Sequence, residues 1–190
     1  MQTVALFIDN SNFYHSLKES RRLPFPYSDY DILFSKLEQQ FGFKLKKIVL
    51  YDAMKDIGIE PGPYARQQKF HSEINTLKAK WPISIRTRKL RYRKLDKNSK
   101  RRIPEEKGVD ILLVVDAFLT ALDQNPGNAV DAIIILSGDA DFVPMVEAIQ
   151  TKFSKEAINL HLYTGSSTEL RTCCKRHILI SFENNDILLR

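Results

Sequence analysis

The stretch TVALFIDNSN, residues 3–12, decides the class of fold. Its first six residues form a short apolar run that is typical of a β-strand buried on both faces. Asp9 ends this run, and Asn10 or Ser11 is suited to cap a helix that we expect to continue to Arg21. A buried strand that leads directly into a helix is the opening of a βα unit. Asp9 itself has two interpretations, as a helix cap or as a ligand in a metal site.

The rest of the chain repeats this alternation of strands and helices. We predict further strands over 46–53, 83–95, 129–136 and 157–164, and helices over 29–41, 64–81, 108–122 and 139–153. A short helix and one apolar segment are expected within 166–190. The alternation predicts an α/β fold, with a doubly wound and mainly parallel sheet that has helices on both faces. Because no repeat or linker interrupts the pattern, we expect residues 1–190 to form a single domain.

One segment accounts for the whole positive charge of the chain. The sequence has 29 Lys and Arg against 23 Asp and Glu, a net charge of +6. Residues 86–107 contain eleven of the basic residues and three of the acids, so the remainder of the chain has a net charge of −2. Apolar and basic side chains alternate over 83–95, which predicts a basic β extension around 83–104. Such a concentrated patch suits a polyphosphate partner; the competing interpretation is a solvated hairpin without a partner.

This basic segment contains the candidates for nucleic-acid binding. Tyr92 lies between two arginines, where its ring would either stack on an unpaired base or cover the sheet. The basic side chains are expected to contact phosphates. The complete set is Arg86, Arg88, Arg91, Tyr92, Arg93, Lys94, Lys100, Arg101, Arg102 and Lys107.

Composition and motifs exclude several classes of protein. The chain is 43% hydrophobic and 27% charged, as in soluble globular proteins. We expect no membrane association, because there is no signal-peptide pattern and no apolar run approaches the roughly 18 residues that span a bilayer. Cys173 and Cys174 are adjacent and have no other cysteine to pair with, which predicts a reduced, cytoplasmic protein. We expect no nucleotide cofactor, since neither G-x-G-x-x-G nor a Walker motif is present.

The predicted fold brings four aspartates to one edge of the sheet. Asp9 follows the first strand, and Asp139 and Asp141 follow the strand AIIIL. Asp110 lies in the first turn of the helix that leads into that strand. In open α/β sheets, sites form beyond the carboxyl ends of the strands. Each aspartate alone could be a helix cap, but together they would repel one another unless a hard cation such as Mg²⁺ or Mn²⁺ lay between them.

Three motifs in this arrangement resemble a known family. DNSN at 9–12, EKGVD at 106–110 and SGDADF at 137–142 resemble the NYN domains of the PIN-like nuclease superfamily, in particular the LabA-like group. The resemblance extends from Val4 to about Ile180. It implies a PIN-like parallel-sheet fold and a metal-dependent endoribonuclease that cuts RNA at an aspartate cluster with Mg²⁺ or Mn²⁺. A bound cation of this kind can activate water for hydrolysis of a phosphodiester.

The resemblance also implies roles for individual residues. The catalytic, metal-binding acids would be Asp9, Asp110, Asp139 and, joining them, Asp141. Supporting roles fall to Asn10 and Asn12, which would orient the first carboxylate or contact substrate, to Ser137, and to Asp116. Asp116 lies about 9 Å along the helix from Asp110 and on another face, so we expect a supporting or structural role.

One departure from the family pattern and several alternatives remain. Relatives often have an Asp before an aromatic residue near the C-terminus, whereas this chain has Lys175, Arg176 and His177. Cys174 and His177 have half the spacing of a zinc site, without a second half. A phosphatase of the haloacid-dehalogenase type would need an acid where Ser11 stands. The second function hypothesis is a non-catalytic RNA-binding or regulatory module. DNA as substrate and the oligomeric state, including a homodimer, stay open.

Overall fold

A seven-stranded, mostly parallel sheet forms the centre of the molecule. The computed structural model describes residues 1–94, 102–184 and 186–190. The strand order is β3-β2-β1-β6-β7-β8-β9, and β9 alone runs antiparallel to its neighbour. The strands are β1 (Gln2–Asp9), β2 (Phe43–Met54), β3 (Ile83–Lys89), β6 (Ala132–Leu136), β7 (Glu156–Leu162), β8 (Arg176–Glu183) and β9 (Asp186–Leu189).

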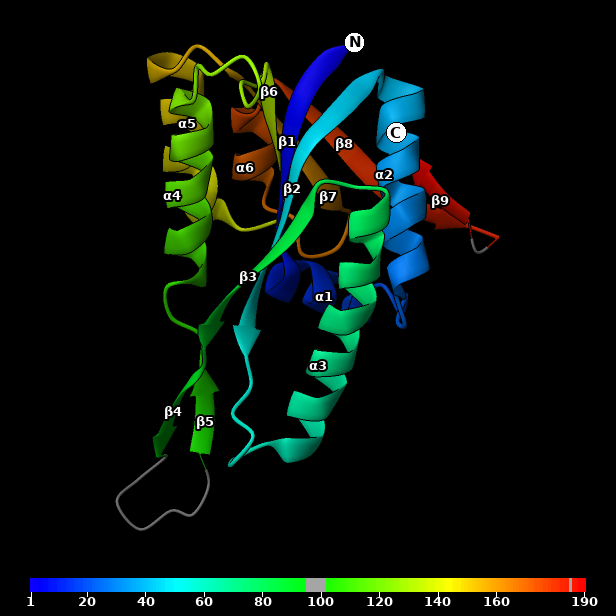
Figure 1. The fold of residues 1–190 in the computed structure, drawn as a ribbon, viewed down its shortest axis with the longest axis vertical. Helices are drawn as coiled ribbons and strands as arrows, with labels where there is room; N and C mark the ends of the chain where they lie inside the picture. The colour runs from blue at the N-terminus through cyan, green and yellow to red at the C-terminus, as the bar shows by residue number, and fades with distance from the viewer. Residues whose placement is uncertain (95–101, 185) are drawn as a thin grey trace.

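Helices cover both faces of this sheet (Figure 1). One face carries α1 (Asn10–Glu19), α2 (Tyr27–Phe41) and α3 (Pro61–Thr76), and the other carries α4 (Val109–Leu122), α5 (Val143–Lys152) and α6 (Thr168–Cys173). The prediction of a doubly wound α/β fold with helices on both faces is confirmed. Within the described ranges, no helix has both the length and the apolar character needed to cross a membrane.

Strand β1 shows why the opening run has no polar face. Leu6 and Ile8 pack into the core below α1–α3, where Phe34 of α2 also lies. Ala5 and Phe7 pack into the opposite core with Leu113 of α4. Successive side chains of a strand point to opposite faces, so a strand between two helical layers buries every position. All four β1 side chains are fully buried.

The predicted strand over 83–95 is wrong as one continuous element. The main chain leaves the sheet at Leu90, whose amide donates to the Met54 carbonyl at 2.9 Å, and Met54 is the last residue of β2. Beyond it, the described residues offer no further neighbouring strand to pair with. The chain therefore pairs with its own return segment, as the antiparallel hairpin β4 (Arg91–Lys94) and β5 (Arg102–Glu105). This basic hairpin projects beyond the carboxyl edge of the sheet (Figure 1).

Other differences concern the ends of elements. The helix predicted over 139–153 begins as a 3₁₀ turn at Ala140–Phe142 and continues as α5, with Pro144 in its first turn. The strand predicted over 129–136 begins only at Ala132. The C-terminal segment folds back as β9, which the sequence pattern does not predict.

The strand order creates a crevice between β1 and β6. From β1 the sheet grows through β2 in one direction, and from β6 through β7 in the other. Ile8 pairs with Leu136, so the residues that follow the two strands lie side by side. Connections that leave neighbouring strands in opposite directions open a crevice at the carboxyl edge. Asp9 and Ser137 therefore meet at this point.

Candidate active site

Asp9 lies at the floor of the crevice. The residue is only 4% exposed. One carboxylate oxygen accepts a hydrogen bond from the Asn12 amide at 3.1 Å, which caps α1. The other oxygen accepts from the Ser137 hydroxyl at 2.9 Å. The helix-cap interpretation therefore holds in the structure, and the same carboxylate also belongs to the group of residues at the sheet edge.

Hydrogen bonds join the two loops that form the crevice. The Asn12 side-chain oxygen accepts from the Gly138 amide at 2.8 Å, and the Ser137 hydroxyl accepts from the Asp139 amide at 3.2 Å. The carboxylate of Asp139 then accepts from the Asp141 amide at 2.9 Å. These bonds hold Asp139 in position after β6. Asn12 and Ser137 act as positioning residues.

Asn10 points in a different direction from Asn12. Its side-chain oxygen accepts a hydrogen bond from the Tyr30 hydroxyl at 3.1 Å. Tyr30 belongs to α2 and is buried. The contact therefore connects the start of α1 to α2 beneath the crevice.

Gly138 is required by a close approach of two loops. A Cβ atom at this position would lie 2.0 Å from the carbonyl oxygen of Gly165 and 2.7 Å from Cα of Ser166. The Gly138 carbonyl accepts from the Ser167 amide at 2.8 Å. No side chain fits here without displacing backbone, which explains why glycine stands between Ser137 and Asp139.

Electrostatics show that the acids lie close together. Burial raises the pKa of Asp9 to about 7, and the negative charges of Asp110 and Glu106 add to this shift. Burial also raises the pKa of Asp110, with further contributions from Asp139 and Asp141. Carboxylates raise one another's pKa only at short range. The structure thus places Asp9, Asp139 and Asp141 within electrostatic range of Asp110, and it adds a fifth acid.

Glu106 is the fifth acid, and the sequence analysis missed it. It lies in the loop between β5 and α4, just before Gly108 with its left-handed φ of 81°. Burial raises the pKa of Glu106, as do the charges of Asp110 and Asp52, while a hydrogen bond from Ser11 opposes the shift. Within the described part of the chain its Oε1 atom is buried and has no hydrogen-bond partner. The only signal in the sequence was its place in EKGVD, where we counted it with the basic segment.

Asp52, at the end of β2, lies near this group but is otherwise engaged. Its Oδ2 atom accepts from the side-chain Nε2 of Gln67 at 2.8 Å and lies 2.7 Å from His71 Nε2. Both partners belong to α3. Asp52 therefore anchors α3 to the sheet and leaves the site to the acid cluster, which we define as Asp9, Glu106, Asp110, Asp139 and Asp141.

The acid cluster fits a hard divalent cation by its chemistry. Its ligands are carboxylate oxygens. Burial, followed by the charges of neighbouring carboxylates, raises the pKa of Asp9, Glu106 and Asp110, and among the described residues the buried Oε1 of Glu106 has no hydrogen-bond partner. Mg²⁺ and Mn²⁺ prefer such oxygen ligands. Among the described residues, however, no three His, Cys, Asp or Glu side chains are already arranged to hold an ion. A cation would therefore have to draw exposed carboxylates such as Asp110 and Asp141 inward.

The environment of Cys174 does not support a zinc site formed by Cys174 and His177. Cys174 is buried in the core beside α5 and α6. Burial raises the pKa of its thiol to about 12. A zinc ligand is a thiolate, so this environment opposes metal binding.

Asp116 has a structural environment away from the acid cluster. Its carboxylate is buried and accepts from the Tyr51 hydroxyl at 2.7 Å and from Arg86 Nη1 at 2.9 Å. These contacts join α4 to β2 and β3. The structure therefore places both Asp116 and Arg86 in an ion pair between helix and sheet, although Arg86 was predicted to bind nucleic acid.

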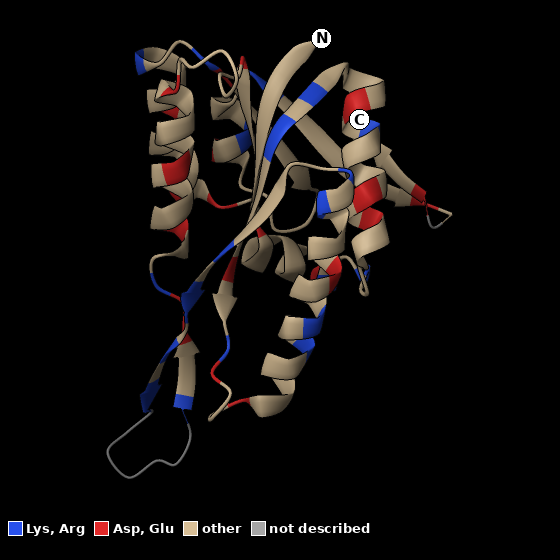
Figure 2. Cartoon of the chain, viewed as in Figure 1, with Lys and Arg blue, Asp and Glu red and all other residues tan. Residues whose placement is uncertain are grey.

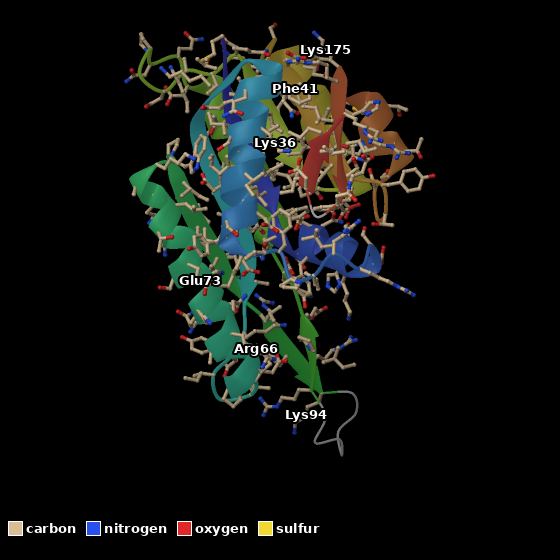
Figure 3. The ribbon with its side chains drawn as sticks, turned by 90° about the vertical axis from the view of Figure 1, so that its right-hand side faces the viewer. Lys36, Phe41, Arg66, Glu73, Lys94 and Lys175 are labelled. Atoms are coloured by element: carbon tan, nitrogen blue, oxygen red, sulfur yellow. The ribbon has the colours of Figure 1, made fainter. Side chains whose placement is uncertain are left out.

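The other basic candidates are distributed around the hairpin. Basic residues are concentrated on β4, β5 begins with Arg102 and ends with Glu105, and an acidic residue lies at the start of α4 (Figure 2). Lys94 lies at the far end of the hairpin, and Arg66 of α3 reaches the same end of the molecule (Figure 3). The exposed candidates are Arg88, Arg91, Arg93, Lys94, Arg102 and Lys107. Lys107 pairs with Glu105 at 3.4 Å, and Lys100 and Arg101 lie outside the described residues.

The Tyr92 side chain does not cover the sheet, and its hydroxyl is hydrogen-bonded within the protein. Its hydroxyl bonds to Glu60 and accepts from the Asp56 amide at 3.1 Å. Both partners lie in the loop between β2 and α3. Tyr92 therefore connects the basic hairpin to that loop.

Comparison with known proteins shows the family of the chain. A doubly wound α/β domain with acids at the switch point of its sheet has the arrangement expected of a PIN-like nuclease. The family model of the NYN domain matches residues 3–181, and the chain belongs to this family. NYN domains lie within the PIN-like nuclease superfamily and are generally nucleases.

Other comparisons show the fold alone. A protein of unknown function, VPA0982 from Vibrio parahaemolyticus RIMD 2210633, has a similar solved structure with a TM-score of 0.66 and 20% sequence identity. The match covers 98% of this chain and 96% of that one. No curated protein matches the sequence.

Proposed function

We propose that this protein is a divalent-metal-dependent endoribonuclease. The observation that carries the proposal is the acid cluster at the switch point of a NYN domain, where burial and the charges of Asp110 and Glu106 raise the pKa of Asp9, and burial and the charge of Asp110 raise that of Glu106. Evolution of a stable fold alone would not favour a buried Asp9 beside other carboxylates, because its ionisation there costs free energy. A bound cation would offset that cost.

The residues of the acid cluster would have different roles in binding the cation. Asp9, Asp110 and Asp139 would hold Mg²⁺ or Mn²⁺, and Asp141 and Glu106 would complete the set of ligands. When bound, such a cation supplies a water of lowered pKa and neutralises charge on the phosphate. Ser137 and Asn12 hold Asp9 and the turn at 138–141 in position through the hydrogen bonds described above.

The basic hairpin supports a nucleic-acid substrate. It joins Glu106 directly through Glu105, the last residue of β5, so bound phosphates would lie next to the acids. Exposed arginines on one projecting hairpin suit the backbone of a single strand, which they can contact without reading its sequence. We take RNA as the substrate, in keeping with the LabA-like motifs, and DNA is an outcome that the test distinguishes.

A cleavage assay tests the proposal. The protein is incubated with labelled single-stranded RNA, or with DNA of the same sequence, in Mg²⁺, Mn²⁺ or EDTA. We expect cleavage of RNA that requires metal and is lost in Asp139→Asn. Asp123→Asn is the matched control, because Asp123 follows α4 at its other end and Asn can still accept from the Asn125 amide. RNA binding without cleavage in any metal would instead support the non-catalytic module.

A further inference from the structure

A groove separates the basic hairpin from the loop between β2 and α3. It has a volume of about 450 Å³, within the range of small-ligand pockets. The two segments that form it lie beyond the carboxyl edge of the sheet, below α1 in Figure 1. Its lining residues are Gly58, Ile59, Glu60, Tyr92, Arg102 and Pro104.

The wall of this groove is fixed by hydrogen bonds. The Tyr92 hydroxyl donates to Glu60 Oε2 at 2.5 Å and accepts from the Asp56 amide at 3.1 Å. The Asp56 carboxylate in turn accepts from the Gly58 amide at 2.8 Å. These contacts hold the Glu60 carboxylate between loop and hairpin. Because the site is arranged before a ligand arrives, binding costs less ordering entropy.

The lining suits a flat ring with polar edges. The lining is mostly polar, and Ile59, Tyr92 and Pro104 contribute its smaller apolar part, on which a nucleobase can stack. Glu60 offers a carboxylate acceptor, and Arg102 offers guanidinium donors. A phosphate would be repelled by Glu60, so the groove is better matched to a base than to the backbone.

We infer that this groove binds a guanine base of the RNA substrate, an inference that rests on the proposed function. Guanine presents O6 and N7 acceptors, which Arg102 can contact in the pairing that arginine makes most often with bases. It also presents two adjacent donors, N1–H and the N2 amino group, which match one carboxylate. Adenine would place the unprotonated N1 against Glu60, and cytosine has a single amino group for the same acceptor.

The groove is close enough to the acid cluster to select the cleavage position. Pro104 precedes Glu106 by two residues, which corresponds to about 7 Å of extended chain. A base held against Pro104 would therefore lie within one or two nucleotides of the phosphate at the acids. Cleavage would then occur at a constant short distance from guanine.

Binding without cleavage tests the groove separately from the nuclease. The intact protein is titrated, in EDTA, into labelled oligouridine RNAs that carry one central G, A or C, and fluorescence anisotropy gives each Kd. We expect the G-containing RNA to bind about tenfold more tightly than the other two. In Glu60→Gln this preference should disappear, while the Tyr92 hydroxyl still finds an acceptor and the melting temperature stays close to that of the wild type. Glu73→Gln, an equal change of charge on α3 outside the groove, should keep the preference (Figure 3).

The outcomes separate the two proposals. Equal Kd values for the three RNAs, or an unchanged preference in Glu60→Gln, would overturn the guanine site. Metal-dependent cleavage in that case would leave the nuclease proposal standing. A guanine preference in EDTA with no cleavage in any metal would support the groove and refute the nuclease.

Discussion

The carboxylate of Asp9 accepts a hydrogen bond of 2.9 Å from the hydroxyl of Ser137, although 128 positions separate the two residues in the chain. The bond joins the carboxyl ends of β1 and β6. These neighbouring strands form the switch point, from which further strands are added to the sheet in opposite directions. The same hydroxyl accepts from the Asp139 amide at 3.2 Å. One side chain therefore positions two of the acids that we propose to bind metal.

Replacing Ser137 by alanine should reduce both the stability of the protein and its rate of cleavage. Asp9 would lose a donor to its ionised form, and Asp139 would lose the acceptor for its amide. We expect a loss of roughly 1–3 kcal/mol in the free energy of unfolding, from urea titration, because a buried hydrogen bond is left incomplete. Cleavage rate should fall by about tenfold or more, since a loosened ligand costs catalytic geometry. Ser84→Ala on the exposed side of β3 is the control, and equal effects in both variants would argue against a positioning role.

The stability of the metal-free protein should depend on Asp9 and on pH. The pKa of Asp9 is raised from 3.8 to about 7, so the folded state keeps a proton that the unfolded chain has already released. Stability is therefore lost as pH rises from about 4 to about 7, and the loss is complete above that range. In Asp9→Asn this term is absent. From urea titration at pH 8, we expect the free energy of unfolding of the variant to exceed that of the wild type by about 2–4 kcal/mol. At pH 4 this difference should disappear. A difference that does not vary with pH would contradict the assignment.

Divalent metal should stabilise the wild-type protein against heat. A ligand that binds only the folded state raises its stability in proportion to the logarithm of its concentration over Kd. We expect Mn²⁺ in excess to raise Tm by several degrees, a shift that EDTA reverses. In Asp110→Asn the rise in Tm caused by Mn²⁺ should be smaller, because the substitution removes one ligand at an exposed position with little effect on packing. An equal shift in the variant would mean that the cation binds elsewhere.

Gly138 should tolerate no side chain. A Cβ there would lie 2.0 Å from the Gly165 carbonyl oxygen, so alanine must displace one of the two loops. We expect Gly138→Ala to lower the free energy of unfolding by at least about 3 kcal/mol and to abolish cleavage. Gly62→Ala is the matched control. It lies in the first turn of α3, where a Cβ meets only Arg66 Nη1 at 3.6 Å, and alanine should stabilise the helix by up to about 1 kcal/mol.

The Asp116–Arg86 pair should affect folding without affecting chemistry. Asp116→Ala leaves the Tyr51 hydroxyl and the Arg86 guanidinium without their acceptor. We expect a loss of about 2–3 kcal/mol in the free energy of unfolding, because the carboxylate is buried while Arg86 remains half exposed. Cleavage per folded molecule, measured well below Tm, should match the wild type. If the fully folded variant cleaved RNA much more slowly than the wild type, Asp116 would have a role in the active site.

Much of the fold follows from local periodicity. The run TVALFI, the helices after it and the later strand AIIIL each carry their own pattern, so the doubly wound sheet could be predicted from the chain. The break at Leu90 could not. The pattern of alternating apolar and basic residues continues through it, and only the end of β2 at Met54 removes the partner strand. Strand β9 is likewise decided by pairing with β8.

The candidate site divides in the same way. Asp9, Asp110, Asp139 and Asp141 follow from the rule that strand ends and helix starts share one edge of an α/β sheet. Their residue types and order along the chain are sufficient for that prediction. The role of Glu106 is not local, because its acidity depends on burial beside Asp110. In the sequence it is one acid within a basic segment.

The sequence by itself determined the alternation of strands and helices, the carboxylates at their ends and the concentration of positive charge at 86–107. Only the tertiary structure decided which charged side chains face the crevice. It paired Arg86 with Asp116, turned Tyr92 toward Glu60 and left Glu106 Oε1 buried among other acids. The physical reason is range: periodicity acts over a few residues, whereas pairing, burial and the pKa shifts that follow depend on distances between segments that lie far apart in the chain.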